Sequence, residues 1–106
     1  MSEAPNIPDF DRLIHEPSRL AIVAVLYACE RADFTYLLNA TELTKGNLSS
    51  HVKKLEEAGY VDIHKGYKGN YPYRTYALTK LGRKKFEEYR KQVVKLAKQF
   101  DQNHQE

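Results

Sequence analysis

The sequence predicts one mainly helical α+β domain, and three observations lead to this fold class. The chain has 106 residues with 42% hydrophobic content, a length that favours a single domain with a single core. Apolar residues recur at helical spacing before Ala58 and again after Thr79. Between these stretches they alternate with polar residues, as in β-strands. The predicted order is therefore several helices, two strands and a final helix.

The first helix is predicted from Pro17 to about Cys29. Proline suits the first helical position because its φ is already set and it has no N–H to lose. Residues 1–8 contain two prolines and are expected to form a flexible arm. A short turn with Phe10 and Leu13 follows the arm. The helix itself is apolar on nearly all sides, which predicts a central, buried position.

Two further helices are expected, each with an N-cap residue. Asp33 can cap a helix over residues 34–40, and Thr44 can cap a helix that points Leu48, Val52 and Leu55 inward. Gly59 is expected to end this helix. Two helices joined by a short turn form a helix-turn-helix unit.

The strands are predicted around Val61 and Ile63 and around Tyr76 and Leu78. Residues 66–72 between them are rich in turn residues and longer than a two-residue hairpin loop, so they are expected to project as a wing. Thr79 can cap a last helix over residues 80–101, and residues 102–106 are expected to form a flexible tail. The complete pattern is a winged helix-turn-helix domain over residues 9–79 followed by a C-terminal helix.

Several functional classes lack their usual motifs. A single cysteine cannot form an internal disulfide, and no apolar run is long enough for a membrane span or signal peptide, so we expect a soluble cytoplasmic protein. The four histidines are scattered, no catalytic or phosphate-loop motif occurs, and the glycines at positions 46, 59, 66, 69 and 82 are typical of turns and caps. We therefore expect no metal, no cofactor, no membrane partner and no enzymatic activity.

The net charge of +3 is unevenly distributed. Residues 1–43 carry a net −4, residues 44–85 carry ten basic against three acidic residues for a net +7, and residues 86–106 are neutral. The basic segment comprises the third helix, the wing and the start of the last helix. A one-sided basic surface is typical of proteins that bind the phosphates of nucleic acids.

A helical wheel of the third helix places small, polar and basic residues opposite its apolar side. Such side chains can approach base edges in the major groove of DNA. The alternative is a merely solvated helix face, which leaves Gly46, an unfavourable residue in a helix, unexplained. The predicted DNA contacts from this helix are Thr44, Lys45, Gly46, Asn47, Ser49, Ser50, Lys53 and Lys54.

The wing contains five of the eight tyrosines, at positions 60–76, interleaved with basic residues. Strand parity assigns Tyr60 and Tyr76 to the core and leaves the other tyrosines exposed, where phenols and cations can contact phosphates or the minor groove. Ordinary hairpin packing is the alternative for each tyrosine. The predicted DNA contacts from the wing are Lys65, Tyr67, Lys68, Tyr71 and Arg74.

The segments at residues 13–22, 43–61 and 74–79, together with Gly82, resemble small winged-helix transcriptional regulators of the MarR/ArsR-like superfamily. The resemblance covers about residues 10–90 and is carried most specifically by LSSHVKKLEEAGYV. It implies a homodimeric repressor or activator that reads a pseudo-palindrome. Base reading then falls on Lys45, Asn47, Ser49, Ser50 and Lys53, and backbone contact on Lys54, Lys68 and Arg74. The paired ligands of metal-sensing members are absent, so metal sensing is not implied, and a small-molecule effector is left open.

The last helix carries an apolar stripe with heptad spacing. Phe86, Val93 and Phe100 recur every seven residues, with Tyr89 and Leu96 three positions after the first two, which is typical of a helix-helix seam. The alternative is that the stripe packs on its own domain, as expected for Leu81 and for the inner end of the stripe. The predicted homodimer contacts are Phe10, Leu13, Phe86, Tyr89, Val93, Leu96 and Phe100.

The sequence therefore predicts a homodimeric, sequence-specific regulator that binds double-stranded DNA. Winged helices also serve as adaptors in protein assemblies, and a fold does not dictate a function. A protein-interaction module without specific DNA binding is the alternative.

Overall fold

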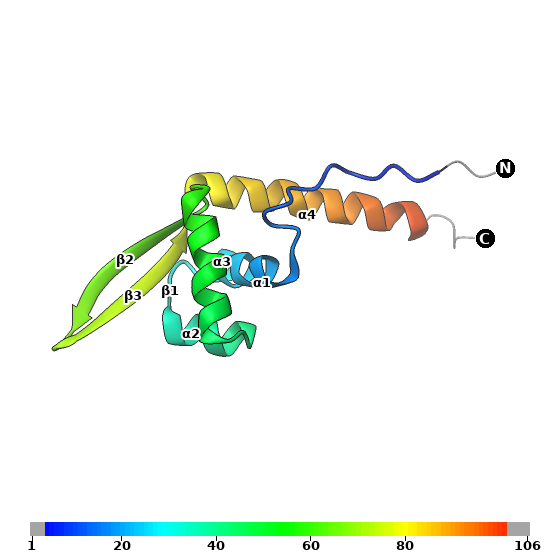
Figure 1. The fold of residues 1–106 in the computed structure, drawn as a ribbon. Coiled ribbons are helices and arrows are strands. Elements are labelled where there is room, and N and C mark those ends of the chain that lie inside the picture. Colours follow the sequence, from blue (N-terminus) through cyan, green and yellow to red (C-terminus); the bar gives the residue numbers. More distant parts are fainter. Residues whose placement is uncertain (1–3, 102–106) are drawn as a thin grey trace.

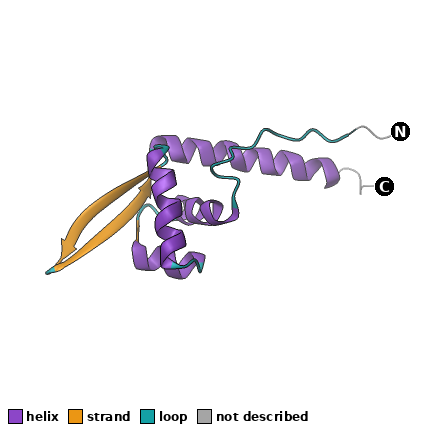
Figure 2. Ribbon diagram, viewed as in Figure 1, coloured by secondary structure: helices purple, strands orange, loops and turns teal. Residues whose placement is uncertain are grey.

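A computed structural model describes residues 4–101 and shows the α+β, mainly helical fold class that the sequence predicts (Figures 1 and 2). Residues 1–3 of the expected arm and residues 102–106 of the expected tail lie outside the described part. The elements are α1 (Pro17–Ala28), β1 (Ala32–Asp33), α2 (Phe34–Thr41), α3 (Lys45–Glu57), β2 (Val61–Lys68), β3 (Tyr71–Leu78) and α4 (Lys80–Asp101).

The elements form a helical body with two long extensions. Figure 1 shows α1, α2 and α3 gathered in the body, the β2–β3 hairpin projecting from one side, and α4 running past the body in the opposite direction. The molecule consequently measures 66 × 24 × 22 Å. No helix in the described part of the chain is long and apolar enough to cross a membrane.

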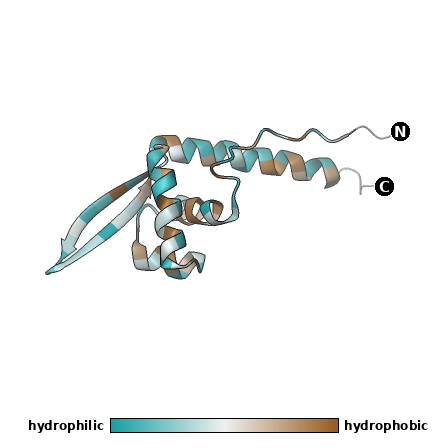
Figure 3. Ribbon diagram, viewed as in Figure 1, coloured by the Kyte–Doolittle hydropathy of each residue, from teal (hydrophilic) through white to brown (hydrophobic). Residues whose placement is uncertain are grey.

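A single core joins the helices to the base of the hairpin. Ile22 and Leu26 of α1, Leu48 of α3 and Tyr76 of β3 are among its buried members, and Phe86 extends it to α4. Along α4, hydrophobic residues recur between hydrophilic ones (Figure 3), as expected for a helix with one apolar side. Burial of both Tyr60 and Tyr76 confirms their predicted core positions.

The side chains that the sequence predicts as N-caps do cap α2, α3 and α4. Asp33, Thr44 and Thr79 accept the backbone N–H groups of Tyr36, Asn47 and Gly82, respectively. These bonds satisfy N–H groups that lack partners within the first helical turn. The end of α3 follows the Schellman pattern, with Gly59 donating to the Glu56 carbonyl and Tyr60 to the Leu55 carbonyl. The predicted helix boundaries therefore have a local chemical basis.

At the start of α1, Glu16 is the N-cap and Pro17 the first helical residue. The Glu16 carboxylate accepts the Arg19 N–H at 2.8 Å. This bond holds the pKa of Glu16 below its ordinary value of 4.5, with smaller contributions from the Ser18 N–H and from the nearby Arg19, and against an opposing effect of burial. The ionised carboxylate therefore stabilises the folded state.

Glu16→Gln is expected to lower the free energy of unfolding at neutral pH by about 1 kcal/mol or less, because the side chain is partly exposed to solvent. A carboxyl group whose pKa is lower in the folded state stabilises above its unfolded pKa, and this stability is lost as pH falls through its folded pKa. The difference from the parent protein should therefore shrink in acid. Urea unfolding of both proteins, at neutral pH and at a pH below the folded pKa of Glu16, measures this difference in the free energy of unfolding. The exposed Glu30→Gln is the control, and an equal loss at both pH values would contradict the prediction.

The hairpin differs from the predicted loop over residues 66–72. The two strands pair from Val61↔Leu78 to Lys68↔Tyr71, so only Gly69 and Asn70 form the turn. Gly69 has φ +65°, a conformation that glycine adopts readily at the first central position of a type II′ turn. A two-residue turn, which the sequence analysis excludes, is therefore present. The wing is two paired strands nearly to its tip.

The sheet also has a third strand that the sequence does not predict. Ala32 and Asp33 of β1 pair with Tyr76 and Thr75 of β3, which gives the strand order β1-β3-β2. Because β1 has two residues, it covers the base of β3 only. The outer edge of β3 from Tyr71 to Arg74 has no paired strand in the described structure.

Two residues early in α4 differ from their predicted positions. Leu81 is exposed instead of packed on its own domain. Gly82 is neither a turn nor a cap residue, but lies buried in the first turn of α4 against the backbone of Tyr60. A side chain at position 82 would occupy the space of the Tyr60 carbonyl group, whose oxygen accepts the Thr79 N–H at 3.0 Å. This close approach fixes where α4 leaves the sheet.

The described part of the expected arm follows a defined path beside α4 (Figure 1). The Asn6 N–H donates to Gln99 Oε1 at 2.8 Å, and Gln99 Nε2 donates back to the Asn6 carbonyl at the same distance. Closer to the body, Gln92 Nε2 donates to the Asp9 carbonyl at 3.4 Å. Residues 4–9 thus contact the half of α4 that extends beyond the helical body.

Candidate nucleic-acid interface

The outer face of α3 is the first part of the candidate interface. Leu48, Val52 and Leu55 are buried beneath it. All eight residues predicted as DNA contacts on and beside this helix are exposed. The helix therefore presents the small, polar and basic surface that its sequence predicts.

His51 is the polar residue of α3 that turns inward. Arg19 Nη1 lies 3.2 Å from His51 Nδ1, and because arginine can only donate, Nδ1 accepts. Arg19 Nε also donates to the Leu13 carbonyl at 2.6 Å, and the Glu16 carboxylate lies 3.9 Å from both Arg19 Nη1 and His51 Nδ1. This polar cluster links the inner side of α3 to the start of α1.

A second polar cluster connects the body to α4. The Tyr60 hydroxyl donates to the Asp11 carboxylate, and burial, followed by this hydrogen bond, raises the pKa of Tyr60. Tyr89 Oη lies 2.7 Å from His15 Nδ1, and burial raises the pKa of Tyr89. Both phenols are therefore neutral at physiological pH. Residues 9–16 are thus linked to two helices. The Leu13 carbonyl binds Arg19, which in turn contacts His51 of α3, and His15 contacts Tyr89 of α4.

The wing is the second part of the candidate interface. Tyr67 and Tyr71 are 76% and 78% exposed, and Lys65, Lys68 and Arg74 are also exposed. The wing residues predicted from the sequence are therefore at the surface. Their exposure leaves them free to contact a large ligand.

The strand register places two basic side chains of the wing on the face that lies toward α3. Lys65 and Arg74 are paired across β2 and β3, so their side chains share one face of the sheet. With Ser49 and Lys53 of α3 they line a hollow of about 290 Å³. Basic residues from the helix and the wing thus meet on one surface.

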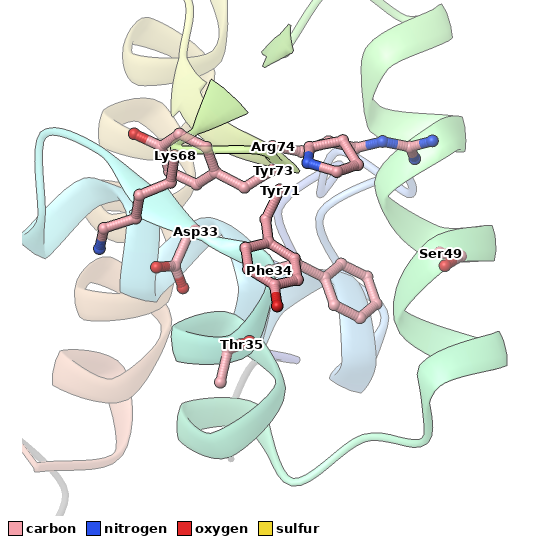
Figure 4. A pocket seen from close by; sticks show the side chains of 9 residues that line it. Asp33, Phe34, Thr35, Ser49, Lys68, Tyr71, Tyr73 and Arg74 are labelled. Carbon is pink, nitrogen blue, oxygen red and sulfur yellow. The ribbon is translucent and has the colours of Figure 1, made fainter. Parts of the chain in front are cut away.

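A larger groove of about 590 Å³ lies beside the unpaired edge of β3. Tyr71, Tyr73 and Arg74 of β3 form its wing side, with Ser49 on the α3 side. Phe34 and Thr35 at the start of α2 complete it (Figure 4). Phe34 and Thr35 are not among the site residues that the sequence predicts. The pairing of β1 with β3 places them there, and a two-residue strand carries too little periodicity to be recognised from sequence.

The predicted dimer contacts fall into two groups. Phe86 and Tyr89 are 8% and 5% exposed and belong to the core of their own domain, which corrects their predicted availability to a partner. Val93 and Phe100 are 40% and 49% exposed, and Leu96 is half-buried. Phe10 and Leu13 are partly buried against the core. The accessible stripe therefore begins at Val93.

Metal ligands do not gather in the described chain. Within residues 4–101, no group of three His, Cys, Asp or Glu side chains is placed to hold a metal ion.

Comparison with known proteins decides the family. Residues 18–97 match the family described as winged helix DNA-binding domain. The chain belongs to this family. The winged-helix protein is 33% identical over 90 residues to an uncharacterised protein of Methanocaldococcus jannaschii, and the alignment covers 85% of this chain and 98% of that protein. The family confirms the predicted winged helix-turn-helix.

Solved structures share the fold. A transcriptional regulator homologue from Pyrococcus horikoshii OT3 has a TM-score of 0.71 and 28% identity, covering 89% of the winged-helix protein and 90% of that chain. The transcriptional repressor CouR bound to a 23-mer DNA duplex has a TM-score of 0.73 and 15% identity, covering 89% and 66%. A MarR family regulator from Silicibacter pomeroyi has a TM-score of 0.61 and 20% identity, covering 89% and 60%.

These similarities confirm the predicted resemblance to small winged-helix regulators, and the fold is shared with a MarR family regulator. The family and the shared fold support a DNA-binding regulator.

Proposed function

We propose that the winged-helix protein is a cytoplasmic homodimeric regulator that binds a specific sequence in double-stranded DNA. In this proposal α3 enters the major groove, where Asn47, Ser50 and Lys53 read base edges. The wing lies beside it and contacts the sugar-phosphate backbone or the minor groove with Lys68 and Arg74.

The observation that carries this proposal is the shared surface of α3 and the wing. The polar, basic outer face of α3 stands next to wing cations, with Lys53, Lys65 and Arg74 around one hollow. A duplex offers both features such a surface requires, namely base edges in a groove and flanking phosphates. CouR, which shares the fold, is described bound to a DNA duplex, and this supports the same use of the fold here.

Exposure of apolar side chains on the outer half of α4 supports the homodimer. Val93 and Phe100 are large exposed hydrophobic residues of α4, and the C-terminal part of α4 extends past the helical body (Figure 1). A second copy can cover these side chains by pairing the same stripe with itself, as in a two-fold interface. Two α3 helices would then reach half-sites about one helical turn of DNA apart.

Selection of bound duplexes from a random DNA pool tests the proposal, because it reports binding, sequence preference and dimer symmetry together. We expect an enriched pseudo-palindrome. No retention of duplex DNA at about 50 mM salt would contradict the proposal and favour a protein-interaction adaptor.

Single variants should separate base reading from phosphate contact. Asn47→Ala and Lys53→Ala are each expected to weaken binding to the selected site by about 1–3 kcal/mol more than binding to random DNA. Lys68→Ala should weaken both about equally and reduce the salt slope by about one unit. Fluorescence anisotropy titrations over a range of salt measure these effects, and Lys98→Ala, outside the proposed interface, is the control. Equal losses on both DNAs from the α3 variants would show that α3 does not read sequence.

A further inference from the structure

We propose that the outer half of α4 carries a docking surface for an acidic amphipathic helix of another protein. This surface, the basic face of α4, surrounds a hollow of about 350 Å³ that is lined by Arg90, Lys91, Val94, Lys95 and Lys98. It shares no residue with the proposed DNA contacts or with the apolar stripe. The docking surface is therefore independent of the proposed function.

The basic face is the third side of the outer half of α4. Residues 4–9 contact one side through Gln92 and Gln99, and the stripe that begins at Val93 is assigned to the homodimer. Successive helical residues are about 100° apart, so Val94 points about 100° away from Val93 and about 160° away from Gln92. Neither the arm nor the proposed two-fold interface uses this side of the helix.

Four cations surround the hollow, and no acid is among its lining residues. All four are exposed, and none of them forms an ion pair within residues 4–101. Glu87, one helical turn before Lys91, is already engaged, because its carboxylate accepts the Tyr27 hydroxyl at 2.9 Å. Asp101 ends α4 and does not line the hollow. A ligand with several carboxylates is therefore the electrostatic complement of this face.

Contacts with α1 hold one border of the hollow in place. The guanidinium carbon of Arg90 lies 5.9 Å from the centre of the Tyr27 ring, within the range of a cation–π contact. The same ring has the guanidinium carbon of Arg83 at 4.8 Å. Because Arg90 is already restricted, less side-chain freedom is lost when a partner binds.

Val94 provides an apolar contact among the cations. It is 49% exposed and lies one helical turn from both Arg90 and Lys98. A nucleic-acid backbone offers phosphates to the cations but no apolar side chain to the valine. An anionic membrane requires a broad apolar helix face with large side chains, whereas one valine lines this hollow. A protein segment that combines carboxylates with an apolar side chain fits both features.

The spacing of the lysines favours a helical partner. Lys91, Lys95 and Lys98 follow one another at i, i+4 and i+7, which places them on one side of α4 over about 10 Å. Carboxylates with the same spacing on a second helix can face all three, as charged residues do beside coiled-coil seams. An apolar residue among these carboxylates can contact Val94. The expected partner segment is an acidic amphipathic helix of about two turns or more.

Fluorescence anisotropy of a labelled synthetic peptide tests the docking surface. The probe is a helical peptide of about four turns, with glutamates at i, i+4 and i+7 around a central leucine. We expect a Kd at or below about 100 μM at about 50 mM salt. Two control peptides replace all glutamates by glutamine or the leucine by serine. Each control should bind at least about fivefold more weakly.

Two neighbouring valines locate the site. Val94→Ser should weaken peptide binding at least about fivefold, because it removes the apolar contact, and it should leave self-association unchanged. Val93→Ser removes the same side chain, 40% exposed, from the apolar stripe. This control should change peptide affinity less than twofold. Circular dichroism checks that both variants are folded.

Charge variants test the cations. Lys91→Gln/Lys95→Gln should weaken peptide binding by about fivefold or more, because it removes two of the four positive charges around the hollow. Lys80→Gln/Lys84→Gln makes the same change in net charge at exposed positions early in α4, outside the hollow. This control should change peptide affinity less than twofold. Affinity for duplex DNA should be unchanged in Lys91→Gln/Lys95→Gln.

The outcomes distinguish the docking surface from the proposed DNA surface. Peptide binding that requires glutamate, leucine and Val94, and that persists when duplex DNA is added, supports the proposal. If duplex DNA displaces the peptide, or if Lys53→Ala/Lys68→Ala weakens it as much as Lys91→Gln/Lys95→Gln, the peptide occupies the surface of α3 and the wing and the proposal is wrong.

Three further results would also overturn the docking surface. The first is no peptide binding at about 100 μM, and the second is a loss in Val93→Ser as large as that in Val94→Ser. The third is a loss of duplex affinity in Lys91→Gln/Lys95→Gln, which would assign the basic face of α4 to nucleic acid. Selection of duplexes from a random pool can succeed or fail in each case, so the two proposals are tested separately.

Discussion

Gly82→Ala is expected to destabilise the protein by about 3 kcal/mol or more, at the upper end of the range for overpacked interiors. The added methyl group would overlap the Tyr60 carbonyl group and lie 2.9 Å from its carbon. Backbone cannot rotate away as a long side chain can, so α4 must move from the sheet. Domains of this size are stable by roughly 5–15 kcal/mol. Urea unfolding followed by circular dichroism measures the loss.

Gly46→Ala is the matched control for this substitution. Gly46 also lies in the first turn of a helix, but a methyl group there would meet no atom within 4 Å. Helix propensity then predicts a stabilisation of up to about 1 kcal/mol. A loss in Gly46→Ala as large as that in Gly82→Ala would show that the close approach to Tyr60 is not the cause. The same control variant also reports on DNA, because added bulk on the outer face of α3 should weaken binding to the selected site.

The double variant Leu96→Glu/Phe100→Glu is expected to weaken self-association at least 100-fold, or about 2.7 kcal/mol. Burial of unpaired carboxylates in an apolar contact is unfavourable. Phe100 is 49% exposed in the single chain, so its replacement should leave the core intact. Loss of the dimer should also weaken binding to a two-half-site DNA, since the second half-site no longer benefits from tethering. Sedimentation velocity at micromolar concentration measures the association.

Lys95→Gln/Lys98→Gln is the control for charge. It makes the same change in net charge on the same part of α4, but both lysines are exposed and lie outside the apolar stripe. The control should remain dimeric. A Leu96→Glu/Phe100→Glu protein that stays a dimer would refute the assignment of the interface to the outer half of α4.

Local chemistry explains why much of this fold is predictable from sequence. Asp33, Thr44 and Thr79 each have a short polar side chain directly before a helix, and the structure uses all three as caps. Leu48, Val52 and Leu55 have the spacing of one buried helical side. The outer face of α3 follows from the same spacing, which is why its eight candidate residues are found exposed.

The features that sequence analysis misses depend on partners far along the chain or on solvent. The wing lies outside the body, so the outer parts of β2 and β3 lack a buried face and the alternation that reveals strands. Gly66 and Pro72 then suggest a loop where paired strands exist. Gly82 packs against Tyr60, and Phe34 reaches the groove only because β1 pairs with β3. Tyr89 shows the reverse case, since its heptad position indicates a partner helix while its ring packs on its own core.

The unpaired edges of the wing also affect the tendency of the protein to aggregate. Beyond β1, the backbone of β3 is unpaired on its outer side, and β2 is the opposite edge of the sheet. Long unpaired edges invite strands of other molecules to add and begin aggregates. Pro72 lacks an N–H for such pairing, and Lys65 and Lys68 place repelling charge along β2. Both features disfavour the addition of one wing to the edge of another.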